Sequence, residues 1–257
     1  MPSGDISPVL IAGEAARSQY DALIELVRQG VPLPDCLVCL AGQGRGFHGF
    51  RNRTWVSPPG NIYLSVHFSP NQAMPSAGSA FMILAAMAAL RAIDAQPGFE
   101  GRAGIKWVND ILIDNAKVCG VLAHTAIEGD RVTDAVLGIG LNVLSSPSVP
   151  PTPFVPRAAA LNDIAKGIDL ASTLASLLKS LREGYDQLRA GRSCSLLDEY
   201  RDRSLVIGRR VEVWSDRPGR EPRLLADGVV SGFTDRLELL IEGHSRPVAS
   251  GRLVFEN

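Results

Sequence analysis

The chain has 257 residues, with 26 basic and 27 acidic side chains and a formal net charge of −1. Its 46% apolar and 21% charged content is typical of a globular protein and excludes a disordered tail, a collagen-like rod and a coiled coil. The near-neutral charge also argues against a nucleic-acid binder that depends on global basicity. Arginine dominates the basic residues, because lysine occurs only at 106, 117, 166 and 179.

The first half of the chain alternates strand and helix patterns. A short strand at 8–12 precedes an amphipathic helix at 15–28, which Gly30 ends, and buried strands follow at 36–41 and 61–68. The glycine- and arginine-rich stretch GQGRGFHGFRNRTW lies between the last two strands and is expected to be a loop. The segment from Pro75 to Ala95 is the strongest helix, and it is so apolar that most of its sides must be buried.

The second half predicts more strands, a proline-rich loop, two helices and a small β module. The strands are expected at 104–107, 111–113, 118–124 and 136–143. Proline fills five of the ten positions at 147–156, which predicts a loop there, and helices follow at 170–190 and 195–203. We expect an α+β domain at 1–204, with a mixed or antiparallel sheet flanked by helices, and a β module at 205–257.

The N-terminus and the cysteines bear on the compartment. No basic region precedes an apolar core at the N-terminus, and the longest apolar run, 80–90, is shorter than the ~20 residues that cross a bilayer. We therefore expect a cytoplasmic protein without membrane contacts. Cys36 and Cys39 form a CxxC pair in an apolar run with no second pair and no nearby histidine, which favours buried thiols over a redox or metal site.

Two stretches suggest a site for anions. No Asp or Glu occurs at 36–93, whereas Arg45, Arg51 and Arg53 follow one another among closely spaced glycines whose backbone amides can converge on a polyphosphate. An ordinary arginine- and glycine-rich surface loop is the alternative interpretation. Downstream, KWVND and KVCGVL place Lys106 and Lys117 in apolar strands, where a charge is costly unless it is paired or meets a ligand. Point-charge contacts to a carboxylate or phosphate would explain both lysines.

Four motifs resemble those of the biotin protein ligase family. GRGFHG, Trp55 and the run SPPGNIYLS at 57–65 are similar to the family signature GRGRxGRxWxSPxGxNLYLS, and KWVNDI, KVCGVL and GIGLN are similar to KWPND, KxxGIL and GIGIN. The tail, with IGRRVEV, DGVVSGF and ASGRL, resembles the family's C-terminal SH3-like module. The resemblance implies a catalytic domain of the class II synthetase-like biotin/lipoate ligase type at 1–204, and a small SH3-like β-barrel at 205–257.

The same resemblance implies a two-step ligase. Biotin's carboxylate attacks the α-phosphate of ATP, which gives biotinyl-5′-AMP and pyrophosphate, and a lysine of a biotin carboxyl carrier protein then takes the biotinyl group. Mg²⁺ bridging the phosphates is expected, although no dedicated metal motif is visible. A lipoate or octanoate protein ligase or transferase of the same fold and a non-catalytic biotin-binding homologue remain alternatives. The chain starts directly at the catalytic domain, so we expect no DNA-binding helix-turn-helix and no repressor function.

The resemblance also assigns roles to individual residues. Lys117, Asp110 and Arg45 are the predicted catalytic residues: Lys117 contacts the carboxylate and phosphate, Asp110 handles metal or the incoming lysine's proton, and Arg45 belongs to the closing loop. The biotin-binding residues are Ser18, Gln43, Gly44, Arg45, Gly46, Lys117, Gly120, Leu122 and Gly138. The nucleotide-binding residues are Arg51, Arg53, Trp55, Lys106, Asn109, Asp110, Gly140 and Asn142. Simple packing of Trp55 and plain turns at Asn109 and Asn142 are the alternatives.

The chain also departs from the family pattern. Phe47 stands where a second loop arginine is usual, so the closing loop is expected to use Arg51 or Arg53 instead. Ser18-Gln19-Tyr20 matches the family's serine-threonine-asparagine poorly, and Arg252 replaces a usual glutamate. The C-terminal module either only packs against its neighbour or helps to hold nucleotide or the carrier. A monomer and a homodimer joined through an edge strand are both compatible with the sequence.

Overall fold

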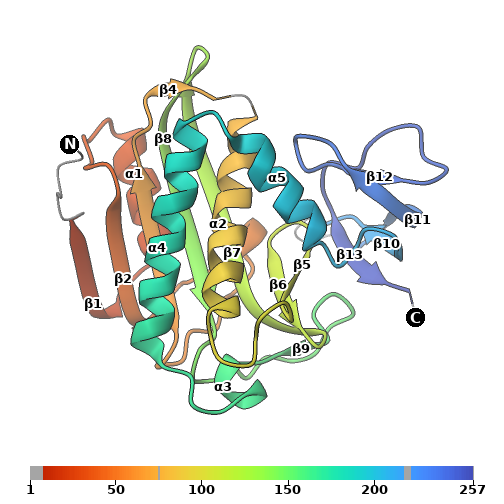
Figure 1. Cartoon of the computed structure of the whole chain (residues 1–257), viewed down its shortest axis with the longest axis horizontal. Coiled ribbons are helices and arrows are strands. Elements are labelled where there is room, and N and C mark those ends of the chain that lie inside the picture. The colour runs from red at the N-terminus through yellow and green to blue at the C-terminus, as the bar shows by residue number, and fades with distance from the viewer. Residues whose placement is uncertain (1–7, 75, 217–220, 257) are drawn as a thin grey trace.

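The computed structural model describes residues 8–74, 76–216 and 221–256, and within them it has a larger and a smaller part (Figure 1). The larger part is a nine-stranded sheet with helices on both faces, and the smaller part is a four-stranded sheet at the C-terminal end. The mixed sheet flanked by helices confirms the α+β fold expected from the sequence.

The large sheet is mixed and mostly antiparallel. Its strands are β1 (Val9–Ala15), β2 (Leu37–Gly44), β3 (Ile62–Phe68), β4 (Gln72–Ala73), β5 (Gly104–Lys106), β6 (Asp110–Ile113), β7 (Ala116–Glu128), β8 (Arg131–Leu141) and β9 (Arg157–Ala158). The main order is β1-β2-β3-β8-β7-β6-β5, with β4 paired to β8 and β9 paired to β7. The β1–β2 and β7–β9 pairs are parallel. In the strand order, β3, β8 and β7 lie at the centre and have hydrogen-bonded neighbours on both sides.

Helices cover the two faces unequally. The helix α1 (Gln19–Arg28) lies on one face, whereas α2 (Ala77–Asp94), α4 (Leu170–Arg189) and α5 (Ser193–Asp202) lie together on the other (Figure 1). The short α3 (Leu161–Ile164) and the 3₁₀ turn η1 (Phe50–Asn52) lie in connecting loops. By length and composition α2 could cross a membrane, but 78% of its residues are buried inside the protein, as in the core helix of a globular domain. Gly184 of α4 faces Leu84 of α2, where a Cβ would clash.

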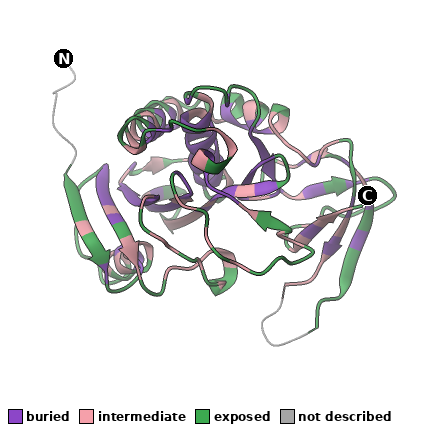
Figure 2. Ribbon diagram, turned by 90° about the horizontal axis from the view of Figure 1, so that it is seen from below, coloured by how far each residue is buried: buried purple, intermediate pink, exposed green. Residues whose placement is uncertain are grey.

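Side-chain alternation along the central strands gives the sheet its two faces. Leu64, Val66 and Ile139 belong to the large core beneath the helices α2, α4 and α5. The opposite face carries Leu37, Cys39 and Val136, which pack against Leu23 and Ile24 of α1 in a separate cluster. Buried residues concentrate on the helix-covered sheet, whereas β1 at its edge is mostly exposed (Figure 2). Because α1 is short, it covers only one end of its face.

The small sheet packs against the end of the large one. Its strands are β10 (Arg210–Trp214), β11 (Leu224–Phe233), β12 (Leu239–Ile241) and β13 (Arg252–Phe255), in the order β12-β11-β10-β13. Hydrogen bonds join the parts: for example, Trp107 Nε1 donates to the Leu237 carbonyl at 2.6 Å, and Arg201 donates to the Phe233 carbonyl at 3.1 Å. The proposed division after Ser204 falls between α5 and β10.

Some predicted boundaries were wrong. The helix expected at 15–28 begins at Gln19, because Ala15 still pairs with Gly44 in the sheet and Ser18 caps the helix by accepting a hydrogen bond from the Asp21 amide at 3.3 Å. The strand expected at 36–41 continues to Gly44, and those expected at 118–124 and 136–143 belong to one long hairpin. Pro75 lies outside the described residues, and α2 begins at Ala77.

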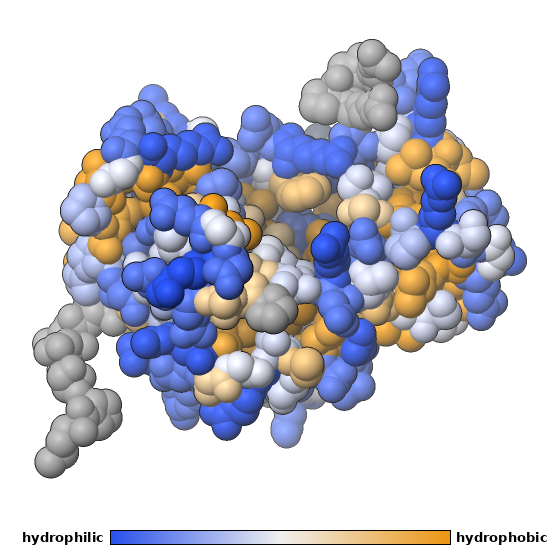
Figure 3. Space-filling model, turned by 90° about the horizontal axis from the view of Figure 1, so that it is seen from above, coloured by the Kyte–Doolittle hydropathy of each residue, from blue (hydrophilic) through white to orange (hydrophobic). Residues whose placement is uncertain are grey.

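The face seen in Figure 3 is largely hydrophilic, with separate apolar patches. Val9, Leu10 and Ile11 of β1 are among the exposed large apolar side chains. Cys36 and Cys39 are buried free thiols, as expected, whereas Cys194 is exposed.

Candidate functional site

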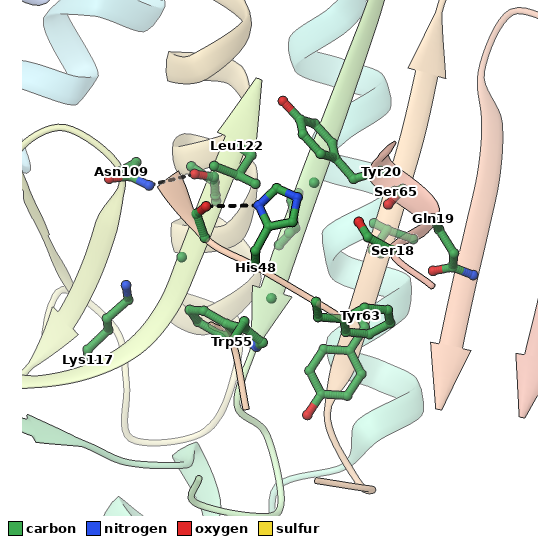
Figure 4. Close-up of a pocket in the computed structure, with 18 residues that line it drawn as sticks. Ser18, Gln19, Tyr20, His48, Trp55, Tyr63, Ser65, Asn109, Lys117 and Leu122 are labelled. Atoms are coloured by element: carbon green, nitrogen blue, oxygen red, sulfur yellow. Dashed lines mark hydrogen bonds between the residues drawn. The ribbon is translucent and has the colours of Figure 1, made fainter. Parts of the chain in front are cut away.

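A pocket opens on the part of the sheet that α1 leaves uncovered; we call it the inner pocket (Figure 4). Ser18, Gln19 and Tyr20 line it from the start of α1, and His48 lines it from the glycine-rich loop at 44–55. Tyr63, Ser65, Gly138 and Leu122 form its floor, on the central strands β3, β8 and β7. The floor residues are directly paired across the sheet or alternate along one strand, so they project on the same side.

The glycines of this floor make room for aromatic side chains. A Cβ on Gly140 would lie 2.7 Å from Trp55, and one on Gly120 would lie 2.8 Å from the same ring. A Cβ on Gly138 would lie 3.1 Å from Tyr20. The flat strip of glycines therefore lets Trp55 and Tyr20 lie against the sheet, and their rings become walls of the pocket. The family resemblance predicts Gly120 and Gly138 as biotin-binding residues and Gly140 as a nucleotide-binding residue.

Lys117 and Asp110 form an ion pair beside Trp55. Lys117 Nζ lies 2.5 Å from Asp110 Oδ1, and each side chain is 19% exposed. The same Nζ is 5.1 Å from the centroid of the Trp55 ring, within the range of a cation–π contact. Neighbouring Asn109 donates from Nδ2 to the Val121 carbonyl at 2.8 Å, which fixes the segment that carries Asp110. A cation is thus held over an aromatic ring at the wall of the pocket.

A second pocket, the outer pocket, continues from the first toward the proline-rich loop. Arg53, Asn142 and Pro147 line it, and the two pockets share Trp55, Asn109 and Lys117. Among the described residues, Trp55 Nε1 and Asn142 Oδ1 are buried polar atoms without a hydrogen-bond partner. A buried unpaired polar group costs roughly 1–3 kcal/mol, so a donor and an acceptor in this state favour a polar ligand in this pocket.

A third pocket, the seam pocket, lies between the two parts of the protein and is rich in cations. Lys106 is buried and donates to the Phe154 carbonyl at 2.5 Å, and Arg252 of the small sheet stacks 3.7 Å from the Phe154 ring centroid. Burial lowers the pKa of Lys106 to about 8, with Asp110 opposing this shift and the charges of Lys117, Arg252 and Arg53 adding to it. Arg53 lines both this pocket and the outer one.

The structure brings most, but not all, of the predicted site residues together. The three pockets are lined by Ser18, Arg53, Trp55, Lys106, Asn109, Asp110, Lys117, Gly120, Leu122, Gly138, Gly140 and Asn142. Gly44 and Gly46 line a further pocket, which shares Phe47, His48 and Trp55 with the inner pocket. Gln43 pairs with Glu14 at the end of β2. Arg45 is 84% exposed and lies 3.3 Å from Glu14, whereas Arg51 donates to the Asp216 carbonyl.

Several residues of the inner pocket were not predicted. Tyr63 and Ser65 alternate with core residues on β3, and a polar residue in such an apolar strand was the available signal. His48 lies beside Asp21 although 27 positions separate them, and no sequence pattern announces that contact. Among the described residues, no group of three or more His, Cys, Asp or Glu side chains is placed to hold a metal ion.

Comparison with known proteins identifies the family. Residues 32–142 match the model of the biotin/lipoate A/B protein ligase family. The biotin--[acetyl-CoA-carboxylase] ligase of Mycobacterium tuberculosis is 32% identical over 218 residues, which cover 82% of this chain and 74% of that protein. The bifunctional ligase/repressor BirA of Bacillus subtilis is 30% identical over 181 residues, or 68% of this chain and 53% of BirA. The chain therefore belongs to the biotin protein ligase family.

Solved structures share the fold. The biotin protein ligase of Aquifex aeolicus in complex with biotin and ATP superposes with a TM-score of 0.69 at 19% identity, over 98% of this chain and 99% of that one. The Leishmania major ligase in complex with biotinyl-5-AMP has a TM-score of 0.59 at 17% identity and covers 98% of this chain and 100% of that one. The chain spans about half the length of the bifunctional ligase/repressors of Bacillus that it matches.

Proposed function

We propose that this protein is a biotin protein ligase: it activates biotin with ATP to biotinyl-5′-AMP and then transfers biotin to a lysine of a biotin carboxyl carrier protein. The observation that carries the proposal is the position of Lys117, which lines both the inner and the outer pocket. A ligand in the inner pocket and a ligand in the outer pocket would therefore meet at this cation. Joining two anions requires a positive charge at the point where they meet.

The inner pocket suits biotin, and the outer pocket suits the nucleotide. The inner pocket combines aromatic and aliphatic walls with a few polar groups, as sites for small organic ligands usually do. Trp55 offers the flat face and unpaired Nε1 donor that an adenine base or its ribose can use in the outer pocket. The cations of Arg53 and Lys106 continue from there toward the seam pocket, where the outer phosphates would be held.

In the first step, a carboxylate oxygen of biotin bonds to the α-phosphorus of ATP, and the bond to the bridging oxygen of pyrophosphate breaks. Lys117 holds the two anionic groups against their mutual repulsion and stabilises the charge on the transferring phosphate. Asp110 keeps the Lys117 side chain in place through their ion pair. The protein thus supplies position and fixed charge, and it forms no bond to the substrate.

Magnesium is the expected companion of ATP. Of the described residues that line the three pockets, Asp110 alone is acidic, which fits an ion carried mainly by phosphate oxygens and water with one protein carboxylate. When bound, Mg²⁺ would neutralise charge on the phosphates.

In the second step, the amine of the carrier lysine attacks the acyl carbon, and the bond to the AMP oxygen breaks. The attacking amine must lose a proton, and Asp110 is the acidic group beside the shared wall of the two pockets. We propose that Asp110 accepts that proton directly or through water. The same proposal includes a biotin carboxyl carrier domain as the acceptor and a cytoplasmic location. Both a monomer and a homodimer are compatible with it.

Biotin-dependent exchange of labelled pyrophosphate into ATP tests the first step. We expect exchange with biotin, little exchange with lipoate or octanoate, and loss of exchange in Lys117→Ala. Lys179→Ala is the matched control, because Lys179 is 76% exposed on α4. Exchange that depends on lipoate would support the lipoate ligase alternative, and folded protein that binds biotin without exchange would indicate a non-catalytic homologue.

A further inference from the structure

His48 joins the glycine-rich loop to helix α1. Its Nε2 lies 2.9 Å and 2.8 Å from the two carboxylate oxygens of Asp21, and its Nδ1 lies 3.0 Å from the Gly49 carbonyl oxygen. Both partners are acceptors and neither can donate, so this geometry is satisfied when both ring nitrogens carry a proton. When His48 is protonated, the bridge between the loop and the helix is an imidazolium paired with a carboxylate.

The surroundings of His48 support its positive charge. Burial lowers its pKa, but the hydrogen bond to the Gly49 carbonyl and the hydrogen bond and charge of Asp21 outweigh burial, so the pKa stands above the ordinary value. From α1, the ring also faces Tyr20, whose ring centroid is 6.3 Å away. Lys117 lines the same pocket from β7, with its charge paired to Asp110. Asp21 lies in the first turn of α1, where the helix dipole favours a negative charge.

Phe47 anchors the loop on the other side of His48. Its ring lies 5.4 Å from the ring of Tyr63 and packs on a small cluster with Ala15 and Ala41. Gly44 must lack a side chain here, because a Cβ would overlap the Phe47 ring. The Phe47 carbonyl also accepts a hydrogen bond from the Trp55 amide at 2.9 Å. The two ends of the loop are thus fastened together over the inner pocket.

The arginines of the loop do not line the inner pocket in the described structure. Arg45 is paired with Glu14 at the surface, and Arg51 donates to the backbone carbonyl of Asp216, which follows β10. Arg53 donates to the Phe50 carbonyl at 2.9 Å and faces the outer and seam pockets. Contacts to the protein's own side chains therefore hold the loop over the inner pocket, where the family pattern has an arginine in place of Phe47.

We propose that Phe47 and His48 form a latch that holds the loop over the inner pocket before any phosphate is bound, and that the latch loosens when His48 loses its proton. Both are positioning residues. That biotin is the ligand of the inner pocket rests on the proposed function, but the closure of the loop does not depend on it. In the proposed reaction, the latch would slow the escape of biotin and of the activated intermediate.

Limited proteolysis with trypsin tests the latch without any ligand, because Arg45, Arg51 and Arg53 are cleavage sites within the loop. The cleavage rate is measured from pH 6 to pH 9 and divided by that of an unstructured reporter peptide at each pH. We expect the relative rate of the unmodified protein to rise about three- to fivefold as His48 deprotonates, the size expected for a partly exposed ion pair.

Three variants separate charge from simple packing. His48→Gln should be cleaved at the high rate throughout the pH range, whereas His48→Arg should keep a pH-independent low rate because its charge persists. Phe47→Ala should be cleaved faster at every pH but retain the pH dependence. Glu14→Gln, which removes the exposed partner of Arg45, is the matched control and should behave as the unmodified protein. Equal relative rates for the unmodified protein and His48→Gln at every pH would overturn the latch.

The rate of biotin dissociation then connects the latch to the site. We expect His48→Gln to release biotin several-fold faster than the unmodified protein at pH 6 and at nearly the same rate at pH 9. If trypsin reports the latch but the protein neither binds biotin nor supports exchange, the proposed function fails and the latch stands. If the protein binds biotin and supports exchange but the relative cleavage rate does not change with pH, the latch fails and the proposed function stands.

Discussion

The ammonium of Lys117 and the carboxylate of Asp110 lie 2.5 Å apart on neighbouring strands, and each side chain is 19% exposed. Each therefore holds the other in position. In a double-mutant cycle on biotin-dependent exchange, we expect Lys117→Ala and Asp110→Asn each to lower kcat by about 100-fold or more, as removal of a preorganised electrostatic contact does. The double variant should be little worse than the poorer single one. Additive losses would contradict a shared role.

Gly140 should be a site where one methyl group disturbs nucleotide binding. The new Cβ of Gly140→Ala would lie 2.7 Å from Trp55 and force the ring away from the sheet. We expect the KM for ATP to rise by about tenfold or more, since misplacement of a binding group by about 1 Å is costly. Gly13→Ala is the matched control, because a Cβ on that strand residue has no heavy atom within 4 Å and should leave KM unchanged.

Lys106 should set the upper end of the pH range in which ATP binds well. Burial lowers its pKa to about 8, so the side chain is cationic below that pH and increasingly neutral above it. Because the charged form attracts phosphate, kcat/KM for ATP should fall as the pH rises above about 8. Lys106→Arg should keep its charge and move the limit upward, whereas the exposed Lys179→Arg should not. An unchanged limit in Lys106→Arg would assign it to another group.

Asp216, which follows β10, should support the glycine-rich loop through its contacts with Arg51 and Arg53. Its carbonyl accepts a hydrogen bond from Arg51, and its carboxylate lies 4.0 Å from Arg53. We expect Asp216→Ala to raise the KM for ATP by about three- to fivefold, as befits a partly exposed ion pair. Asp227→Ala, which breaks an exposed pair with Arg210 inside the small sheet, is the control. No difference between these two variants would indicate that the module only packs against its neighbour.

Much of the fold could be predicted from local patterns. The apolar alternation of β3 and the almost wholly apolar α2 gave correct elements, because each pattern reflects which sides of the element are buried. The start of α1 was misjudged because Ala15 is equally compatible with helix, and only its pairing with Gly44 makes it strand. The pairing partner is a distant segment, which periodicity along the chain does not reveal.

The candidate site divides in the same way. Lys106 and Lys117 could be found because their charges stand out in apolar strands, and the family resemblance pointed to Asp110 and Trp55. The contact of His48 with Asp21 and the outward position of Arg45 depend on how the loop folds back, and three-dimensional packing decides this. The packing of Trp55 and Tyr20 on the floor glycines likewise depends on the three-dimensional structure.

The floor of the inner pocket belongs to β3, β8 and β7, strands with hydrogen-bonded neighbours on both sides, whereas its roof is a loop held by side chains. Floor amides should therefore exchange with solvent only on global unfolding, while roof amides exchange through local opening. In the proposed reaction this difference sets a kinetic competition. The activated acyl group is either transferred to the carrier lysine or released and hydrolysed. The frequency with which the glycine-rich loop opens determines the ratio of the two outcomes.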